Sequence, residues 1–100
     1  MWLSINHWLR GGNVYVIIVY DIAVERVNKV RKYLRQYLMW RQNSVFEGEL
    51  SDSQFMRVKN TLHDMINDSE DHIIFYILRD KKYVREEELG TSKVELGYII

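Results

Sequence analysis

The chain has 100 residues, of which 47% are apolar and 28% charged, and its formal net charge at pH 7 is zero. This length fits one domain, no apolar run approaches the ~20 residues of a membrane-spanning helix, and a neutral chain is not expected to bind nucleic acid indiscriminately. Cysteine is absent, which excludes disulfides and thiolate metal sites and fits a reducing, cytoplasmic location.

Residues 1–13 precede the first predicted strand. They lack the basic start and the long apolar stretch of a secretory signal peptide. Their apolar side chains could share one face of a helix that ends at two glycines: Trp2, Leu3, Ile5, Trp8 and Leu9. We expect residues 1–13 to be a flexible or partner-bound N-terminal extension and residues 14–100 to be the folded domain.

The first predicted strand contains the apolar run VYVIIV, and Tyr20 and Asp21 follow it. Asp21 has two interpretations. Aspartate is a good N-cap for a helix that begins two or three residues later. A metal ligand is the other interpretation, in which a two-fold dimer brings two Asp21 carboxylates together around one divalent cation. Tyr20 is expected either to pack in the core or to assist that site.

An amphipathic helix is predicted over residues 24–39 from apolar residues at helical spacing: Val27, Val30, Leu34, Tyr37 and Leu38. Its other faces are basic. Residues 25–41 hold six basic residues and one acidic residue, a net charge of +5, which leaves −5 for the rest of the chain. Charge segregated in this way indicates phosphate contacts. The alternative interpretation is a basic surface that is simply solvated. The candidate residues are Arg26, Lys29, Arg31, Lys32, Arg35 and Arg41.

A short strand at 38–42 and a β-leaning stretch at 42–50 come next, with Gly48 suggesting a bulge. Ser51 and Gln54 then form the pattern of a capping box. The apolar face of the second helix repeats the spacing of the first: Phe55, Val58, Leu62, Met65 and Ile66. A continuous apolar strand at 72–79 and a β-leaning piece at 83–90 complete the chain.

Two βαβ units of this size predict an α+β fold, a ferredoxin-like βαββαβ sandwich with both helices on one face of an antiparallel sheet. An additional C-terminal strand is expected from the last β-leaning piece. Strands as apolar as these need cover on both faces or from a partner. We therefore expect the uncovered sheet face to meet a second copy of the chain in a homodimer.

Other candidate residues carry weaker signals. Phe46 fits the core or a platform for base stacking, and Glu47 and Glu49 could assist a metal ion. The three histidines show no ligand spacing: His7, His63 and His72. The sequence contains no recognisable Ser-His-Asp triad and no glycine-rich phosphate loop.

The strand ending in Y-D-I, the basic helix, the stretch Q-N-S-V-F-E-G-E-L and the S-x-S-Q helix start together resemble the CRISPR-associated protein two family. The resemblance covers residues 14–100. It implies a ferredoxin-like homodimer that serves antiviral defence. It also implies metal-dependent endonuclease activity on RNA or DNA, and the bridging of CRISPR-associated protein one integrase dimers on duplex DNA during spacer acquisition.

Residue by residue, the resemblance implies that Asp21 binds Mg²⁺ and that Tyr20 and Phe46 lie at the catalytic site. The family often has an arginine just before its Q-x-S-V-F stretch, where this chain has Trp40 followed by Arg41. Successive strand residues face opposite sides, so Arg41 is a poor substitute. We therefore expect the adaptor role to be the main one, with slow Mg²⁺-dependent phosphodiester cleavage beside it. The alternative is a metal-dependent endoribonuclease as the main role.

Overall fold

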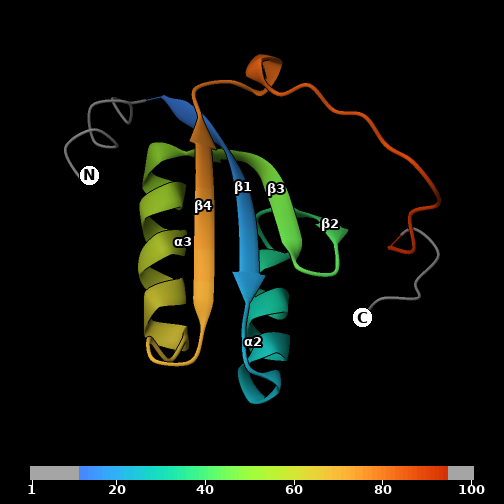
Figure 1. Cartoon of the computed structure of the whole chain (residues 1–100). Helices are drawn as coiled ribbons and strands as arrows, with labels where there is room; N and C mark the ends of the chain where they lie inside the picture. The colour runs from blue at the N-terminus through green and yellow to red at the C-terminus, as the bar shows by residue number, and fades with distance from the viewer. Residues whose placement is uncertain (1–11, 95–100) are drawn as a thin grey trace.

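The computed structural model describes residues 12–94 (Figure 1). Its regular elements are β1 (Asn13–Asp21), α2 (Val24–Leu34), β2 (Met39–Gln42), β3 (Val45–Ser51), α3 (Asp52–Met65), β4 (His72–Leu78) and the short 3₁₀ helix η1 (Lys81–Tyr83). The strands form one antiparallel sheet in the order β2-β3-β1-β4. Both helices cover the same face of this sheet (Figure 1). The α+β ferredoxin-like architecture is thereby confirmed.

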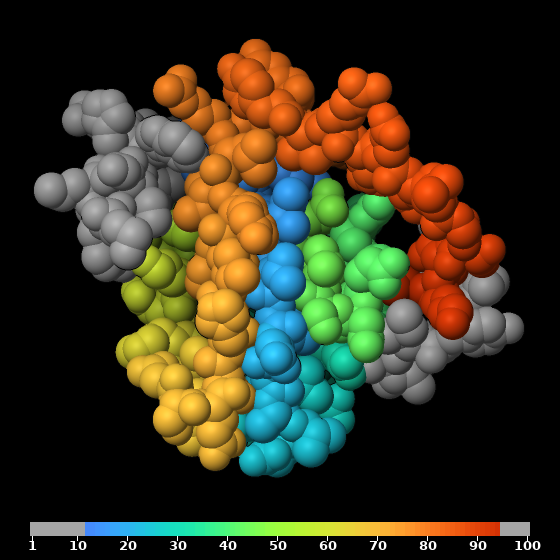
Figure 2. Space-filling model, viewed as in Figure 1, coloured from blue at the N-terminus to red at the C-terminus, as the bar shows by residue number. Residues whose placement is uncertain are grey.

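The strand β1 has one face in the core and one face open. Alternate side chains of a strand point to opposite sides, and the set on the helix side is buried: Val14, Val16, Ile18 and Tyr20. On the other side Ile17 and Val19 are partly exposed, and Asp21 is exposed. Figure 2 shows that no helix of residues 12–94 covers this second face. The apolar run VYVIIV therefore reflects a strand whose open face is apolar as well.

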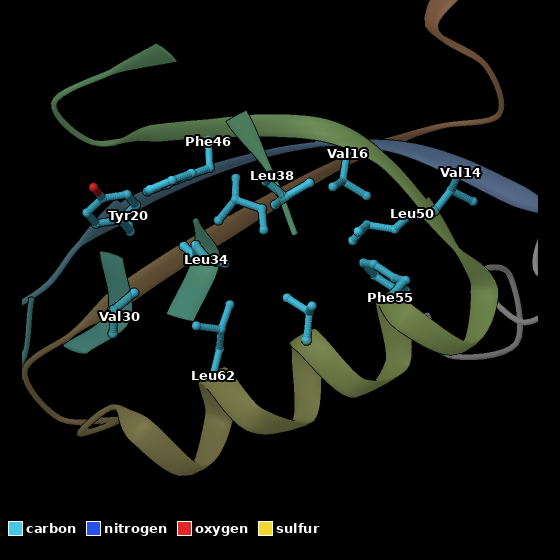
Figure 3. Packing of buried hydrophobic residues seen from close by; sticks show 12 residues of the cluster. Val14, Val16, Tyr20, Val30, Leu34, Leu38, Phe46, Leu50, Phe55 and Leu62 are labelled. Atoms are coloured by element: carbon cyan, nitrogen blue, oxygen red, sulfur yellow. The ribbon is translucent and has the colours of Figure 1, made fainter. Parts of the chain in front are cut away.

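The core lies between the sheet and the two helices (Figure 3). The predicted helix faces are confirmed, because their central residues are almost fully buried: Val30, Leu34, Phe55, Val58 and Leu62. The first helix is shorter than predicted, however, and ends at Leu34. The chain turns there, since the N–H groups of Tyr37 and Leu38 both donate to the Leu34 carbonyl, and the next residues pair with β3 as β2.

The start of α3 confirms the predicted capping box. The Gln54 N–H donates to Ser51 Oγ at 3.1 Å, and the Ser51 N–H donates to Gln54 Oε1 at 3.0 Å. The bulge expected at Gly48 is not there, because β3 pairs with β1 in continuous register across it. The register shift lies in β2 instead, between Trp40 and Gln42. A Cβ at position 48 would lie 3.0 Å from Leu38 Cδ2, so close packing explains that glycine.

The segment after β4 forms no strand within the described residues. It contains η1 and then runs irregularly to residue 94, passing beside β2 (Figure 1). The expected strand at 83–90 is therefore not part of the sheet of a single chain. Of the expected extension at 1–13, Asn13 is already the first residue of β1 and pairs with Ser51. Residues 1–11 of that extension and residues 95–100 lie outside the described residues. Among the helices that the structure describes, none is long and apolar enough to cross a membrane.

Candidate functional site

Asp21 stands at the last position of β1, on the open face of the sheet. The N-cap interpretation of Asp21 is wrong, because α2 begins after Ala23, which has no side-chain cap. Within the described part of the chain, the Asp21 carboxylate takes part in no hydrogen bond or ion pair. Its partner across the antiparallel pair with β4 is His72, which is also exposed. Asp21 is thus an exposed carboxylate that neither caps α2 nor forms an ion pair within the described residues.

A buried carboxylate that the sequence did not single out fixes the chain around Asp21. The side chain of Asp71 is fully buried. Its Oδ1 accepts from the Ala23 N–H at 2.8 Å, and its Oδ2 accepts from Arg26 Nε at 2.7 Å and from the Asn67 N–H at 2.9 Å. The hydrogen bond from Arg26 outweighs the effect of burial and, with the two N–H groups, holds the pKa of Asp71 well below its usual range. Asp71 therefore clamps the start of α2 to the start of β4.

Tyr20 and Phe46 lie on the helix side of the sheet, opposite to Asp21. Their rings stack with centroids 6.1 Å apart, and the Tyr20 hydroxyl donates to the Asn43 carbonyl at 2.8 Å. Phe46 is completely buried. A hollow of about 240 Å³ at this end of the sheet is lined by Tyr20, Asp21, Arg31 and Ser44, among others. Tyr20 and Asp21 therefore border the same hollow from opposite faces of β1, whereas Phe46 is a buried packing residue.

Trp40 and Arg41 face opposite sides of β2, as expected for successive strand residues. The centroids of the stacked Trp40 and Phe46 rings are 6.4 Å apart, and the Arg35 guanidinium lies over the Trp40 ring at 4.4 Å from its centroid. Arg41 reaches the open side, where its Nε lies 3.5 Å from Glu47 Oε1. Arg41 therefore does not replace an arginine at the position of Trp40, although Arg35 brings a positive charge close to it.

The network around Arg41 also includes Glu47, one of the two strand glutamates. Arg41 forms ion pairs with Glu86 and Glu88 of the C-terminal segment. The Tyr15 hydroxyl donates to Glu47, and burial together with this bond raises the pKa of Tyr15 to about 12. In the sheet, Glu47 and Glu49 lie opposite Ile17 and Tyr15, roughly 13 Å and 20 Å along β1 from Asp21. Neither glutamate is placed to share a metal ion with Asp21 of the same chain.

The predicted basic residues separate into three groups. Arg26 is held by Asp71, Glu70 and Glu25, and Arg41 lies in the network on β2. The other four lie on α2 and the turn after it, and all but the half-buried Arg31 are exposed: Lys29, Arg31, Lys32 and Arg35. We call these four residues the α2 basic face. Arg31 also contacts Asn43 Oδ1 at 3.2 Å.

A complete metal centre is not formed by one chain. Within residues 12–94, no group of three or more histidine, aspartate and glutamate side chains converges to hold a metal ion. The carboxylate of Asp21 is nevertheless suited to be one oxygen ligand, because it is exposed and unpaired. A divalent cation there would take its remaining ligands from a second copy of the chain, from water or from phosphate.

Comparisons with known proteins agree with this arrangement. A family model described as CRISPR associated protein Cas2 matches residues 14–86. A CRISPR-associated endoribonuclease Cas2 of Methanosarcina acetivorans is 56% identical over 87 residues, which are 87% of this chain and all of that protein. The equivalent protein of Pyrococcus furiosus is 46% identical over 87 residues, with the same coverage of both chains.

Solved structures give the same result. A crystal structure titled as that of cas2 is 44% identical, has a TM-score of 0.75, and is matched over 82% of this chain and 92% of that chain. The crystal structure of Streptococcus pyogenes Cas2 at pH 6.5 is 32% identical with a TM-score of 0.67, matched over 76% of this chain and 99% of that chain.

Proposed function

The chain belongs to the CRISPR associated protein Cas2 family, and from this premise we propose that it is a homodimeric adaptor of spacer acquisition. In this role the dimer holds duplex DNA and bridges two dimers of the CRISPR-associated protein one integrase. One observation carries the proposal: the chain has an apolar open sheet face on one side and a basic helix face on the other. A dimer formed through the first surface displays two copies of the second.

The open sheet face is suited to a second copy of the chain. Its apolar side chains come from the two neighbouring strands β1 and β4: Ile17, Val19, Ile74, Tyr76 and Leu78. Tyr76 is 53% exposed. A contiguous apolar sheet surface is costly in water and is commonly covered by a partner. Two-fold packing of this face on itself would bury these residues in both subunits.

The α2 basic face is suited to a phosphate backbone. Lys29 and Lys32 are exposed, and within residues 12–94 neither lysine forms an ion pair with a carboxylate. Lysine and arginine side chains bind duplex DNA mainly through phosphates, with little dependence on base sequence. That is the kind of contact an adaptor needs, because it must accept spacers of any sequence.

A second candidate function is metal-dependent cleavage of RNA or DNA, and the unpaired Asp21 carboxylate supports it. The curated relatives carry the name endoribonuclease. In a dimer through the open face, two copies of Asp21 would share that interface and could hold a cation such as Mg²⁺. A bound divalent cation would polarise a scissile phosphate and lower the pKa of an attacking water. Within residues 12–94, no cluster of three or more acidic and histidine side chains converges beside Asp21, so we assign cleavage the secondary role.

Light scattering with and without duplex DNA tests the adaptor proposal. We expect the mass of a dimer for the protein alone and of a dimer bound to DNA for the complex, with binding that weakens steeply as salt rises. A monomer mass at micromolar concentration, or an absence of DNA binding at low salt, would overturn the proposal.

A further inference from the structure

We propose that His72 is a second metal ligand beside Asp21, so that the site prefers first-row transition-metal ions to Mg²⁺. The proposal deepens the secondary function proposed for Asp21 and rests on it. It concerns which ion binds and which side chains hold it.

The first argument is the strand register. Asp21 and His72 are direct partners in the antiparallel pair of β1 and β4. Side chains that are opposite each other in such a pair lie on the same face, with Cβ atoms about 5 Å apart. Both residues are exposed, and both lie on the open face. A carboxylate oxygen and an imidazole nitrogen can therefore converge on one ion at bond lengths of about 2.0–2.2 Å.

The second argument is that the two backbones are fixed relative to each other. Asp71 precedes His72 directly, and Ala23 follows Asp21 by two residues. The 2.8 Å hydrogen bond from the Ala23 N–H to Asp71 ties these positions together. Arg26 closes the clamp from α2 through the same carboxylate. Ligands held on rigid strands with hydrogen-bonded neighbours bind metals with less loss of conformational freedom.

The third argument is the chemistry of the donor pair. Mg²⁺ takes oxygen ligands and keeps several waters, whereas an imidazole nitrogen favours ions later in the first transition row. One Asp21 and one His72 offer one oxygen and one nitrogen. In a two-fold dimer through the open face, the second subunit would offer another such pair. Such a mixed donor set should bind Co²⁺ more tightly than Mn²⁺, and both more tightly than Mg²⁺.

The histidine at position 63 provides a matched control. His63 is exposed on α3, and its Nε2 lies 3.6 Å from Asp68 Oδ2. It is therefore another surface pair of histidine and carboxylate, but no buried clamp holds it. A metal bound merely by surface chemistry would use this pair as readily as the pair of His72 and Asp21.

The experiment is titration with Co²⁺, followed by its visible absorption, and with Mg²⁺, followed by calorimetry. It uses the full-length chain and the variants His72→Ala, His63→Ala and Asp21→Asn. We expect His72→Ala to weaken Co²⁺ binding by at least about tenfold and to leave Mg²⁺ binding within twofold. His63→Ala should change neither, and Asp21→Asn should weaken both. Circular dichroism and light scattering on each variant show whether the fold and the mass are retained.

Two results would overturn the proposal. One is Co²⁺ binding by His72→Ala that equals that of the unmodified chain, and the other is an equal or larger loss in His63→Ala. Neither result touches the dimer or the DNA binding, which light scattering measures separately. If the unmodified chain is monomeric by light scattering and His72→Ala still weakens Co²⁺ binding, the ligand pair is supported and the proposed dimer is contradicted.

Discussion

Arg26 and Asp71 are 45 residues apart in the sequence and form a two-pronged ion pair, with Arg26 Nε 2.7 Å from Asp71 Oδ2 and Nη2 3.1 Å from Oδ1. The pair joins α2 to the turn before β4. It therefore fixes the end of the sheet at which β1 stops with Asp21. Arg26 is one of the basic residues that the sequence suggested for phosphate contact. Its carboxylate partners give it a structural role.

Removing the charge of Asp71 should destabilise the fold. In Asp71→Asn, the Arg26 guanidinium loses its buried counter-charge and one oxygen acceptor is replaced by a donor. We expect the midpoint of thermal unfolding to fall by roughly 10 °C. Asp64→Asn, a change at an exposed position of α3, should leave it within about 2 °C. Equal midpoints for the two variants would contradict the clamp.

The same clamp predicts how stability depends on pH. The pKa of Asp71 is lowered in the folded state, so its contribution is complete above the unfolded pKa of about 3.9 and is lost as pH falls below that value. The difference in unfolding midpoint between the unmodified chain and Asp71→Asn should therefore be constant from about pH 7 to pH 5 and shrink near pH 3. A difference that shrinks as pH rises toward neutrality would have the wrong sign.

A charge on the open sheet face should disrupt the dimer. Tyr76→Arg places a guanidinium among the apolar side chains of β1 and β4, where a partner would have to desolvate it. Light scattering should show a shift from dimer to monomer at micromolar concentration. Tyr83→Arg is the control, because Tyr83 is 61% exposed but lies on η1, outside the sheet. If both variants remain dimers, the interface lies elsewhere.

The α2 basic face should account for much of the affinity for DNA. Replacing Arg31, Lys32 and Arg35 by Ala should weaken binding to duplexes of any sequence and reduce the slope of log affinity against log salt by roughly three. The control removes the same number of charges near η1, at Lys81, Lys82 and Arg85. Fluorescence anisotropy at several salt concentrations measures both quantities. A larger loss in the control would move the DNA to the other end of the sheet.

Local patterns were sufficient to predict most of the fold. The apolar spacing of Val30, Leu34, Val58 and Leu62 reports which side of each helix faces the sheet, because burial follows the helical period. Ser51 and Gln54 indicate the start of α3, because a capping box is formed by residues only three positions apart. The end of α2 was not predictable in this way. No glycine or proline stops the helix after Leu34, and the pairing of β2 with β3 ends it instead.

The candidate site was only partly predictable. Asp21 follows from its place at the end of an apolar strand and from the family resemblance. His72 could not be predicted from the sequence. It lies opposite Asp21 only because of the register of two strands that are distant in the sequence. Asp71 also carries no sequence signal, because it sits in a polar turn where aspartate is common. Its role becomes visible only when the turn is packed against α2.

Asp21→Asn should abolish metal-dependent cleavage, because the amide keeps the shape of the side chain and removes the charge that holds a cation. The dimer should remain intact or become slightly more stable, since two carboxylates at one interface repel each other when no ion is bound. Cleavage of labelled RNA and DNA with and without Mg²⁺ measures the first effect. Undiminished cleavage by a pure preparation of this variant would remove Asp21 from the catalytic site.

Spacer integration by the same Asp21→Asn protein is the most direct test of the adaptor role. The measurement follows the joining of a labelled DNA duplex to a CRISPR repeat in the presence of the partner integrase. Because the substitution leaves the α2 basic face and the apolar sheet face unchanged, we predict integration at the rate of the unmodified protein. A variant that is dimeric and binds DNA, yet no longer supports integration, would contradict the proposal that this protein acts mainly as an adaptor.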